Sequence, residues 1–263
     1  MRGGEDENTV SPASTFTIAI EWCLLKPHTE LSIIIPVLNE ADGIVAALEA
    51  LAPLRNRGVE LIVVDGGSTD ETLTRAAPLA SRVLSAPRGR ARQMNAGAAI
   101  AQGRVLLFLH ADTRLPEKAD ALVALSSTCP AGFPSGFHWG RFDVHIDGQS
   151  VWLKVVARMM NLRSRLTGIA TGDQAMFVTR AIFQSVGGFA DIPLMEDIAL
   201  SKTLLRLHRP LCLTARVSTS GRRWETHGIG RTIVLMWWLR LRYFLGADPQ
   251  QLAQAYGTVP HES

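Results

Sequence analysis

The segment Val105-Leu106-Leu107-Phe108-Leu109-His110-Ala111-Asp112 contains five apolar residues in a row, followed by a histidine and a carboxylate. A short apolar run that ends in polar residues predicts a strand buried on both faces of a sheet. In open α/β sheets, ligands bind just beyond the carboxyl ends of such strands. We therefore expect Asp112 to project into a crevice beside His110. There Asp112 could help to bind a divalent metal or a polar ligand. Alternatively, it could only cap the next turn, and this segment alone does not decide between these two roles.

The strand at 105–109 is one of several that alternate with helices. Apolar, largely β-branched runs predict further strands at 31–37, 59–64 and 82–84. Helical spacing of apolar residues predicts helices at 44–54, from about residue 71, and at 91–101. This alternation is typical of an α/β fold with a doubly wound, mostly parallel sheet, which fills residues 31 to about 125.

Polar motifs follow three of these strands, namely Asn39-Glu40, Asp65 and His110-Ala111-Asp112. A sheet with a purely structural role needs no carboxylate at so many strand ends. Coincidence could place one carboxylate there, but it is a poor explanation for all three, so these motifs are the first candidates for a site.

The sequence changes in character after Pro130. Alternating residues at 137–144 predict an antiparallel pair beside the parallel sheet. We then expect a helix at 151–166, a strand at 175–178, a helix at 198–207 and a strand at 211–217. A polar loop is expected at 218–230, followed by an apolar helix at 232–245. Residues 1–29 are expected to be a flexible leader.

Composition narrows the function. The 263 residues carry a formal net charge of +3, with more Arg than Lys, and this small excess does not indicate nucleic-acid binding. It suits a phosphate-bearing small substrate, because Arg binds phosphate through paired hydrogen bonds. The widely spaced Cys23, Cys129 and Cys212 indicate neither a zinc site nor a disulfide framework, which favours a cytoplasmic protein. No apolar run reaches the roughly 18 residues that span a bilayer, and the N-terminus does not resemble a secretory signal.

A series of motifs resembles the family 2 glycosyltransferases of GT-A fold. In chain order they are LSIIIPVLNE at 31–40, VVDGGSTD at 63–70, RGRARQMNAG at 88–97, LHAD at 109–112, GDQ at 172–174, GGF at 187–189 and MED at 195–197. Each motif is weak alone, but the ordered set, which covers roughly residues 31–230, is highly specific. The GDQ and MED motifs look most like a bacterial subgroup of small, stand-alone members of unassigned substrate.

The resemblance implies a single GT-A domain at 31–230, with a nucleotide-binding half at 31–125 and an acceptor half, with a smaller antiparallel portion, at 130–230. Residues 231–263 would add a C-terminal apolar helix and tail. The implied enzyme is a hexosyltransferase-type glycosyltransferase that inverts the anomeric carbon and depends on a divalent metal. Its donor is a nucleotide-diphosphate sugar, most often of UDP in this family, with GDP and dTDP as alternatives. Its acceptor is a small molecule or is lipid-linked.

On the donor side, the resemblance assigns nucleotide-sugar binding to the strand ends and to the basic loop before the helix at 91–101. Arginines at a helix N-terminus are a natural environment for phosphate oxygens. The residues implied are Pro36, Asn39, Glu40, Asp65, Arg88, Gly89, Arg90, Gln93, Asn95, Ala111 and Asp112.

The charge of the diphosphate leaving group calls for a divalent metal, Mn²⁺ or Mg²⁺. The family binds it with an Asp-x-Asp signature, whose last Asp corresponds to Asp112. The first Asp is replaced here by His110, which can ligate Mn²⁺ and less readily Mg²⁺. The alternative, which we favour slightly, is a neutral hydrogen-bonding role for His110. His227 is a weaker candidate for a late metal ligand, and an ordinary loop histidine is its alternative.

Inversion requires a general base on the acceptor hydroxyl, opposite the leaving group. The resemblance implies Asp197 as this base, with Glu196 orienting the acceptor or the loop. Acids also stabilise a helix N-terminus, which is the alternative role for both. Asp173 either contacts acceptor or sugar, or only occupies a turn. The residues expected on the acceptor side are Gly172, Asp173, Gln174, Arg222, Arg223 and Trp224.

The helix at 232–245 carries Trp237 and Trp238 beside Arg240 and Arg242. It is too short to span a bilayer. We expect it to pack against the sheet or against a second protomer in a homodimer, and attachment to the inner face of a membrane is the alternative.

Two other functions stay open. A catalytically silent sugar-nucleotide-binding module would explain His110, whereas Asp112, Asp173 and Asp197 argue against it. A sugar nucleotidyltransferase-like enzyme would need a Gly-rich, Lys-containing loop after the first strand, where Asn39-Glu40-Ala41 stands instead.

Overall fold

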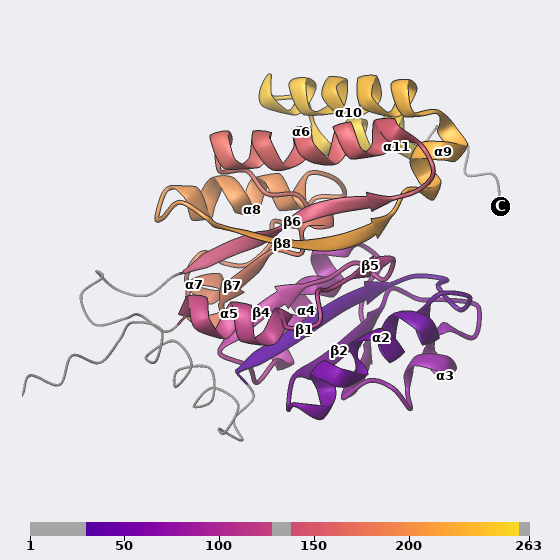
Figure 1. The fold of residues 1–263 in the computed structure, drawn as a ribbon, viewed down its shortest axis with the longest axis vertical. Helices are drawn as coiled ribbons and strands as arrows, with labels where there is room; N and C mark the ends of the chain where they lie inside the picture. The colour runs from indigo at the N-terminus through magenta and orange to yellow at the C-terminus, as the bar shows by residue number, and fades with distance from the viewer. Residues whose placement is uncertain (1–29, 128–137, 258–263) are drawn as a thin grey trace, which may run out of the picture.

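The computed structural model describes residues 30–127 and 138–257. Within them, eight strands form one sheet in the order β3-β2-β1-β4-β7-β6-β8-β5, and helices cover both of its faces (Figure 1). The expected α/β class is therefore confirmed. The leader predicted at 1–29 and the last part of the predicted tail lie outside the described residues.

The first half of the sheet is parallel, as predicted. Its strands are β1 (Leu31–Val37), β2 (Glu60–Asp65), β3 (Arg82–Ser85) and β4 (Val105–Phe108), and all pairings among them are parallel. The helices are α2 (Ile44–Asn56), α3 (Thr72–Ala76) and α4 (Arg90–Ile100), with α5 (Ala119–Ser127) after β4.

The apolar run in β1 forms a strand because both faces of the sheet are covered. Ile33 and Ile35 are buried in one hydrophobic core, and Ile34 is buried in another on the opposite face. Burying one such side chain contributes about 1.5–3 kcal/mol of transfer free energy. A strand buries this apolar run more completely than a helix would, because alternate side chains of a strand point into the two cores.

The second half of the sheet is mixed. Its strands are β5 (Thr113–Arg114), β6 (Trp139–Asp147), β7 (Phe177–Thr179) and β8 (Leu211–Ser220). β7 is antiparallel to β4 and to β6, whereas β8 is parallel to β6 and antiparallel to β5. The antiparallel pair predicted at 137–144 is confirmed in part, because β6 pairs antiparallel with β7, but its longer pairing, with β8, is parallel. Residues 139–147 form one long strand, because Gly140 lies within the ladder, opposite Phe177 and Leu211, and makes no turn.

The remaining helices are α6 (Val151–Thr167), α7 (Arg180–Ser185), α8 (Glu196–Leu205), α9 (Arg222–His227), α10 (Ile229–Phe244) and α11 (Pro249–Gly257), with a 3-10 turn, η1, at Gly172–Gln174. The polar loop predicted at 218–230 is wrong, because β8 continues to Ser220 and α9 packs Trp224 against the main core. The tail also contains α11, whose Leu252 is buried in a small third core.

The apolar helix α10 covers the start of α8, and its first turns pack Ile229 and Ile233 against the main core of the sheet. Its Leu239 is fully buried in the third core, together with Ile169, Met195 and Ile198. No helix of the described residues is both long enough and apolar enough to cross a lipid bilayer. The C-terminal helices thus cover one side of the predicted acceptor region.

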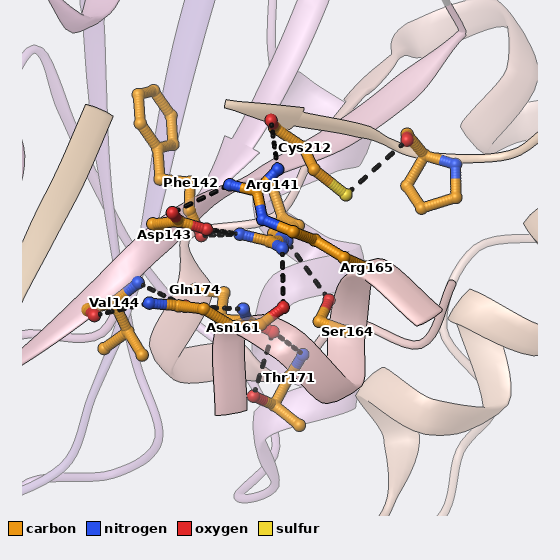
Figure 2. A network of polar contacts seen from close by, with 11 residues as sticks. Arg141, Phe142, Asp143, Val144, Asn161, Ser164, Arg165, Thr171, Gln174 and Cys212 are labelled. Atoms are coloured by element: carbon orange, nitrogen blue, oxygen red, sulfur yellow. Dashed lines mark hydrogen bonds and ion pairs between the residues drawn. The ribbon is translucent and has the colours of Figure 1, made fainter. Parts of the chain in front are cut away.

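A buried arginine ties β6 to α6 (Figure 2). The side chain of Arg141 is 0% exposed and pairs with Asp143. Its guanidinium donates to Ser164 Oγ at 3.1 Å and to the carbonyl oxygens of Phe142 and Asn161 at 3.2 Å. All three nitrogens of this guanidinium are therefore hydrogen-bonded.

The same network extends to η1 (Figure 2). The Asn161 side chain accepts from the Val144 N–H at 2.9 Å and donates to the Val144 carbonyl at 3.0 Å. Asn161 Oδ1 also accepts from Gln174 Nε2 at 3.4 Å, and Gln174 Oε1 accepts from the Thr171 N–H at 3.2 Å. Gln174 is fully buried and anchors the turn that carries Asp173.

Candidate active site

A cavity of about 490 Å³ lies at the carboxyl ends of β1 and β4. The start of α4, η1, the end of β8 and the C-terminal helices complete its walls. Of the residues predicted from sequence, it is lined by Pro36, Glu40, Arg88, Gly89, Arg90, Gln93, His110, Ala111, Asp112, Asp173 and Trp224. The fold thus brings candidates from both halves of the chain into one cavity.

Two smaller cavities adjoin the first. Asn39 and Arg222 line one of about 430 Å³, which shares Asp112 with the main cavity. Gly172 and Asp197 line another of about 100 Å³. The side chains of the two remaining candidates in α9, Arg223 and His227, lie outside the described part of the structure.

Asp65 and Asn39 shape the loops beside the cavity. The buried Asp65 carboxylate accepts N–H bonds from Gly67 at 2.9 Å and Ser68 at 3.0 Å. Asn39, with a positive φ of 53°, accepts from the Thr69 N–H at 2.9 Å, and its own N–H donates to Ser68 Oγ. Neither residue lines the main cavity, so their predicted contacts with base and ribose stay predictions.

Gln93 and Asn95 of α4 also have structural contacts. The buried Gln93 donates from Nε2 to the carbonyl oxygens of Val37 and Val64, both at 2.8 Å, and so joins the ends of β1 and β2. Asn95 bonds both backbone groups of Phe189, at 2.8 and 2.9 Å, and lies away from the cavity.

His110 faces Asp173 across the cavity. Its Nδ1 lies 3.6 Å from Asp173 Oδ1. Burial lowers the pKa of His110, whereas the hydrogen bond and the charge of Asp173 raise it. The rise is the larger effect, so the pKa of His110 is above its usual value. The ring is pressed against Gly172, where a Cβ would lie 2.5 Å from ring atoms. His110 is therefore held between η1 and β4 with Nδ1 turned toward a carboxylate.

The main cavity contains acids suited to a cation. No cluster of three or more His, Cys, Asp or Glu side chains forms a metal site within residues 30–127 and 138–257. Asp112 nevertheless lines the cavity beside Glu40, and burial and the negative charge of Asp112 raise the pKa of Glu40. Oxygen ligands of this kind suit Mg²⁺ and Mn²⁺. A metal here would complete its coordination with oxygens from a bound ligand.

Asp197 lies at the start of α8, after Met195 with a positive φ of 71°. Its Oδ2 accepts from the Gly172 N–H at 2.9 Å and its Oδ1 from the Ile198 N–H at 2.7 Å. The small cavity beside it shares His110 and other residues with the main one. Asp197 thus combines a position in the first turn of α8 with access to the small cavity.

Glu196 is placed differently from its neighbour. Its side chain is 4% exposed, and Oε1 lies 3.1 Å from Arg90 Nε. Its Oε2 is buried and has no hydrogen-bond partner among the described residues. Burial raises the pKa of Glu196, while the Arg90 charge opposes that rise. Glu196 therefore contacts an arginine of the main cavity without lining either cavity itself.

Sequence patterns alone did not identify the residues that the C-terminal helices contribute. Met236, Arg240 and Tyr256 line the small cavity opposite Asp197. The i, i+4 spacing of Met236 and Arg240 was a usable signal, because such residues share a helix face. Tyr256 had no comparable signal, because α11 was predicted as tail.

Comparisons with known proteins agree with this geometry. Residues 32–126 match the family model described as Glycosyl transferase family 2. A PGL/p-HBAD biosynthesis glycosyltransferase of Mycobacterium tuberculosis (strain ATCC 25177 / H37Ra) is 41% identical over 116 residues, which are 41% of this chain and 45% of the relative. The match therefore spans less than half the length of that curated relative.

Solved structures share the fold. S. aureus TarS 1–349 in complex with UDP-GlcNAc has a TM-score of 0.58 at 18% identity, over 73% of this chain and 58% of that one. Glucosyl-3-phosphoglycerate synthase from Mycobacterium tuberculosis, with Mn²⁺, UDP and phosphoglyceric acid, has a TM-score of 0.52 at 21% identity, over 76% and 72%. Residues 32–126 are therefore similar in sequence to the family 2 glycosyltransferases, and the fold is similar to that of TarS and of glucosyl-3-phosphoglycerate synthase.

Proposed function

We propose that this protein transfers a sugar from a nucleotide-diphosphate sugar to an acceptor hydroxyl, with inversion and with a divalent metal. The main cavity carries this proposal, because Arg88, Arg90, Asp112 and Asp173 all line it. Donor phosphates need cations, and an acceptor needs polar groups within reach of the donor sugar. The cavity offers both.

The start of α4 is the proposed site of the donor diphosphate. Gly89 has a φ of 137°, which favours glycine, and α4 begins at the next residue, Arg90. The first N–H groups of a helix together with arginines suit phosphate oxygens. UDP is the preferred nucleotide, with GDP and dTDP as alternatives. The similar fold of TarS was solved with UDP-GlcNAc, which supports this choice.

Asp112 would hold the metal, with oxygens of the donor diphosphate as further ligands. His110 would have a hydrogen-bonding role beside the metal, because its Nδ1 faces Asp173 and its Nε2 lies against Gly172. When bound, Mn²⁺ or Mg²⁺ would neutralise charge that develops on the leaving diphosphate. The similar synthase fold was solved with Mn²⁺ and UDP, which supports a divalent metal.

Asp197 is the proposed general base. The two N–H bonds from Gly172 and Ile198 fix its carboxylate, and each oxygen keeps a second lone pair. An acceptor hydroxyl between the cavities would give its proton to Asp197 while its oxygen attacks the anomeric carbon. Asp173 would contact the sugar or the acceptor, and Glu196 would position Arg90 rather than react.

The test is release of nucleoside diphosphate from UDP-, GDP- and dTDP-sugars with Mn²⁺ or Mg²⁺. Wild type should release it with at least one donor, and Asp112→Ala should lose this activity. Asp191→Asn, which changes an exposed carboxylate outside the cavities, is the matched control and should behave as wild type. Nucleotide sugar that binds without turnover under any metal would identify a silent binding module instead.

We also propose that the protein attaches to the inner face of a membrane. α6 and α10 lie close together, because the charges of Arg163 and Arg240 interact, and both helices expose large apolar side chains. They are Val151, Trp152, Val155, Met159, Leu162 and Leu166 in α6, and Val234, Trp237, Trp238, Leu241 and Phe244 in α10. Soluble monomers rarely expose so much apolar surface.

Tryptophans in both helices, with the exposed Lys154, Arg158 and Arg242, suit an anionic lipid surface. Wild type should sediment with phosphatidylcholine vesicles that contain phosphatidylglycerol. The double variant Trp152→Ser, Trp237→Ser should bind these vesicles more weakly. A stable dimer by light scattering, without vesicle binding, would identify a second protomer as the partner instead.

A further inference from the structure

Arg163 of α6 is a partly buried cation that the described chain leaves incompletely hydrogen-bonded. Its Nε and Nη2 atoms are buried and have no hydrogen-bond partner within the described residues. Burial, together with the nearby charge of Arg240, lowers the pKa of Arg163 to about 10. Buried polar atoms in native proteins are nearly always hydrogen-bonded, so this exception requires an explanation.

Another arginine at the same interface is fully satisfied. Arg141 of β6 is buried between the sheet and α6, and all three of its nitrogens are hydrogen-bonded (Figure 2). The protein can therefore pair a buried guanidinium in this region. The unpaired nitrogens of Arg163 are a local feature and not a general property of α6.

Arg240 of α10 lies near Arg163, and its charge lowers the pKa of Arg163. It lines the small cavity with Asp197, and it has no ion pair with a residue of the described chain. Burial lowers its pKa, and the charges of Asp197 and Asp173 act against that shift. The charge of Asp197 also raises the pKa of Arg163, against the effect of burial. Two guanidinium groups thus lie near the proposed base.

Two neighbouring cations that are partly withdrawn from water destabilise the free protein unless an anion compensates them. A phosphate group matches the pair better than a carboxylate does. It carries up to two negative charges, and its oxygens can accept from two planar guanidinium groups, whereas a carboxylate matches one.

We propose that Arg163 and Arg240 bind a phosphate group of the acceptor and so hold an acceptor hydroxyl at Asp197. This inference rests on the proposed function for the role of Asp197. It names the substrate class as a phosphorylated acceptor, whether a soluble phosphate ester or a phospholipid.

Calorimetric titration with inorganic phosphate tests the site. The protein is first saturated with UDP and Mg²⁺, so that phosphate does not enter the donor cavity. Arg163→Met and Arg240→Met should each weaken phosphate binding about tenfold or more, the effect of one charged hydrogen-bonded contact. Arg231→Met, which changes an exposed arginine of α10, should leave it unchanged.

Equal phosphate affinity in the wild type and in both variants, or no phosphate binding by wild type at millimolar concentrations, would overturn the proposal. If UDP does not bind, the titration is repeated without it, and phosphate binding that depends on both arginines still supports the anion site. If phosphate binding depends on both arginines but no nucleotide sugar is turned over, the proposed function is contradicted and the anion site is not.

Thermal unfolding separates a lost site from a lost fold. Because Arg163→Met removes a buried unpaired charge, it should raise Tm in phosphate-free buffer. It should also abolish the rise in Tm that phosphate gives to wild type, since a ligand stabilises only a state that it binds. A Tm that still rises with phosphate in Arg163→Met and Arg240→Met would contradict the proposal.

Two further titrations identify the source of the phosphate. Glycerol 3-phosphate represents a soluble ester, and phosphatidylcholine vesicles with phosphatidic acid represent a lipid. Binding that requires Arg163 and Arg240 in either titration supports the site and assigns its source. Binding of both probes that is insensitive to these arginines would overturn it.

Discussion

The Nε atom of Arg90 lies 3.1 Å from Oε1 of Glu196, and this ion pair joins the two halves of the chain. Arg90 begins α4 and lines the main cavity, whereas Glu196 begins α8 and is buried. The next residue, Asp197, faces the small cavity. The pair thus sets the distance between the proposed donor site and the proposed base.

Arg90→Met should destabilise the protein, because it leaves the Glu196 carboxylate buried without its cation. The expected loss in free energy of unfolding is about 1–3 kcal/mol, reduced from that of a fully buried pair because Arg90 is 42% exposed. Urea denaturation at pH 7.5 measures this loss. Adding Glu196→Gln should restore much of the stability but not donor binding. No recovery in the double variant would show that the buried charge is not the cause.

Gly172→Ala should weaken metal-dependent binding of UDP. The added Cβ would lie 2.5 Å from the ring of His110, so the ring or η1 must move, at a cost of about 1–3 kcal/mol in stability. Gly43→Ala is the control, because a Cβ added at Gly43 would meet no atom within 4 Å. Calorimetry with UDP and Mn²⁺ tests the difference, and wild-type affinity in Gly172→Ala would argue against a role for the position of His110.

Asp70→Asn should lower stability at neutral pH but not in acid. The Thr72 hydroxyl, followed by the N–H groups of Thr72 and Ala41, lowers the pKa of Asp70 below its usual value. Stability from an acid with a lowered pKa is present above its unfolded-state pKa, about 3.9, and is lost as pH falls through its folded-state pKa. The difference in Tm between wild type and variant should therefore shrink below about pH 4. A difference that is constant from pH 7 to pH 3 would exclude this linkage.

Removal of divalent metal should weaken binding of the donor. Without a cation, the diphosphate and the acids Asp112 and Glu40 repel one another in the main cavity. EDTA should reduce UDP affinity about tenfold or more, and the effect should be smaller in Asp112→Asn. Equal sensitivity to EDTA in both proteins would remove Asp112 from the proposed metal site.

The first half of the fold could be predicted because its signal is local. Runs such as 31–37 and 105–109 are buried on both faces, so their composition alone specifies strands, and the carboxylates that follow them lie at strand ends. The site could be predicted in part for the same reason, since Glu40 and Asp112 follow β1 and β4 into one cavity.

The rest depended on contacts between distant segments. Residues 139–147 form a strand because β7 and β8 pair with it, and α9 is fixed by packing of Trp224, which no short window of sequence records. Asn95 was expected in the nucleotide site, but it binds the backbone of Phe189. Arg163 lies in a predicted amphipathic helix, and only the fold shows that its Nε and Nη2 atoms are buried.

The most direct test of the central claim compares donor binding with turnover in Asp197→Asn. Wild type and variant are titrated with UDP and Mn²⁺, and both are then assayed for release of nucleoside diphosphate from the donor sugar that wild type uses. The account predicts similar UDP affinity and a fall in turnover of about 10²-fold or more for loss of a general base. Wild-type turnover in Asp197→Asn, or a parallel loss of UDP binding, would contradict it.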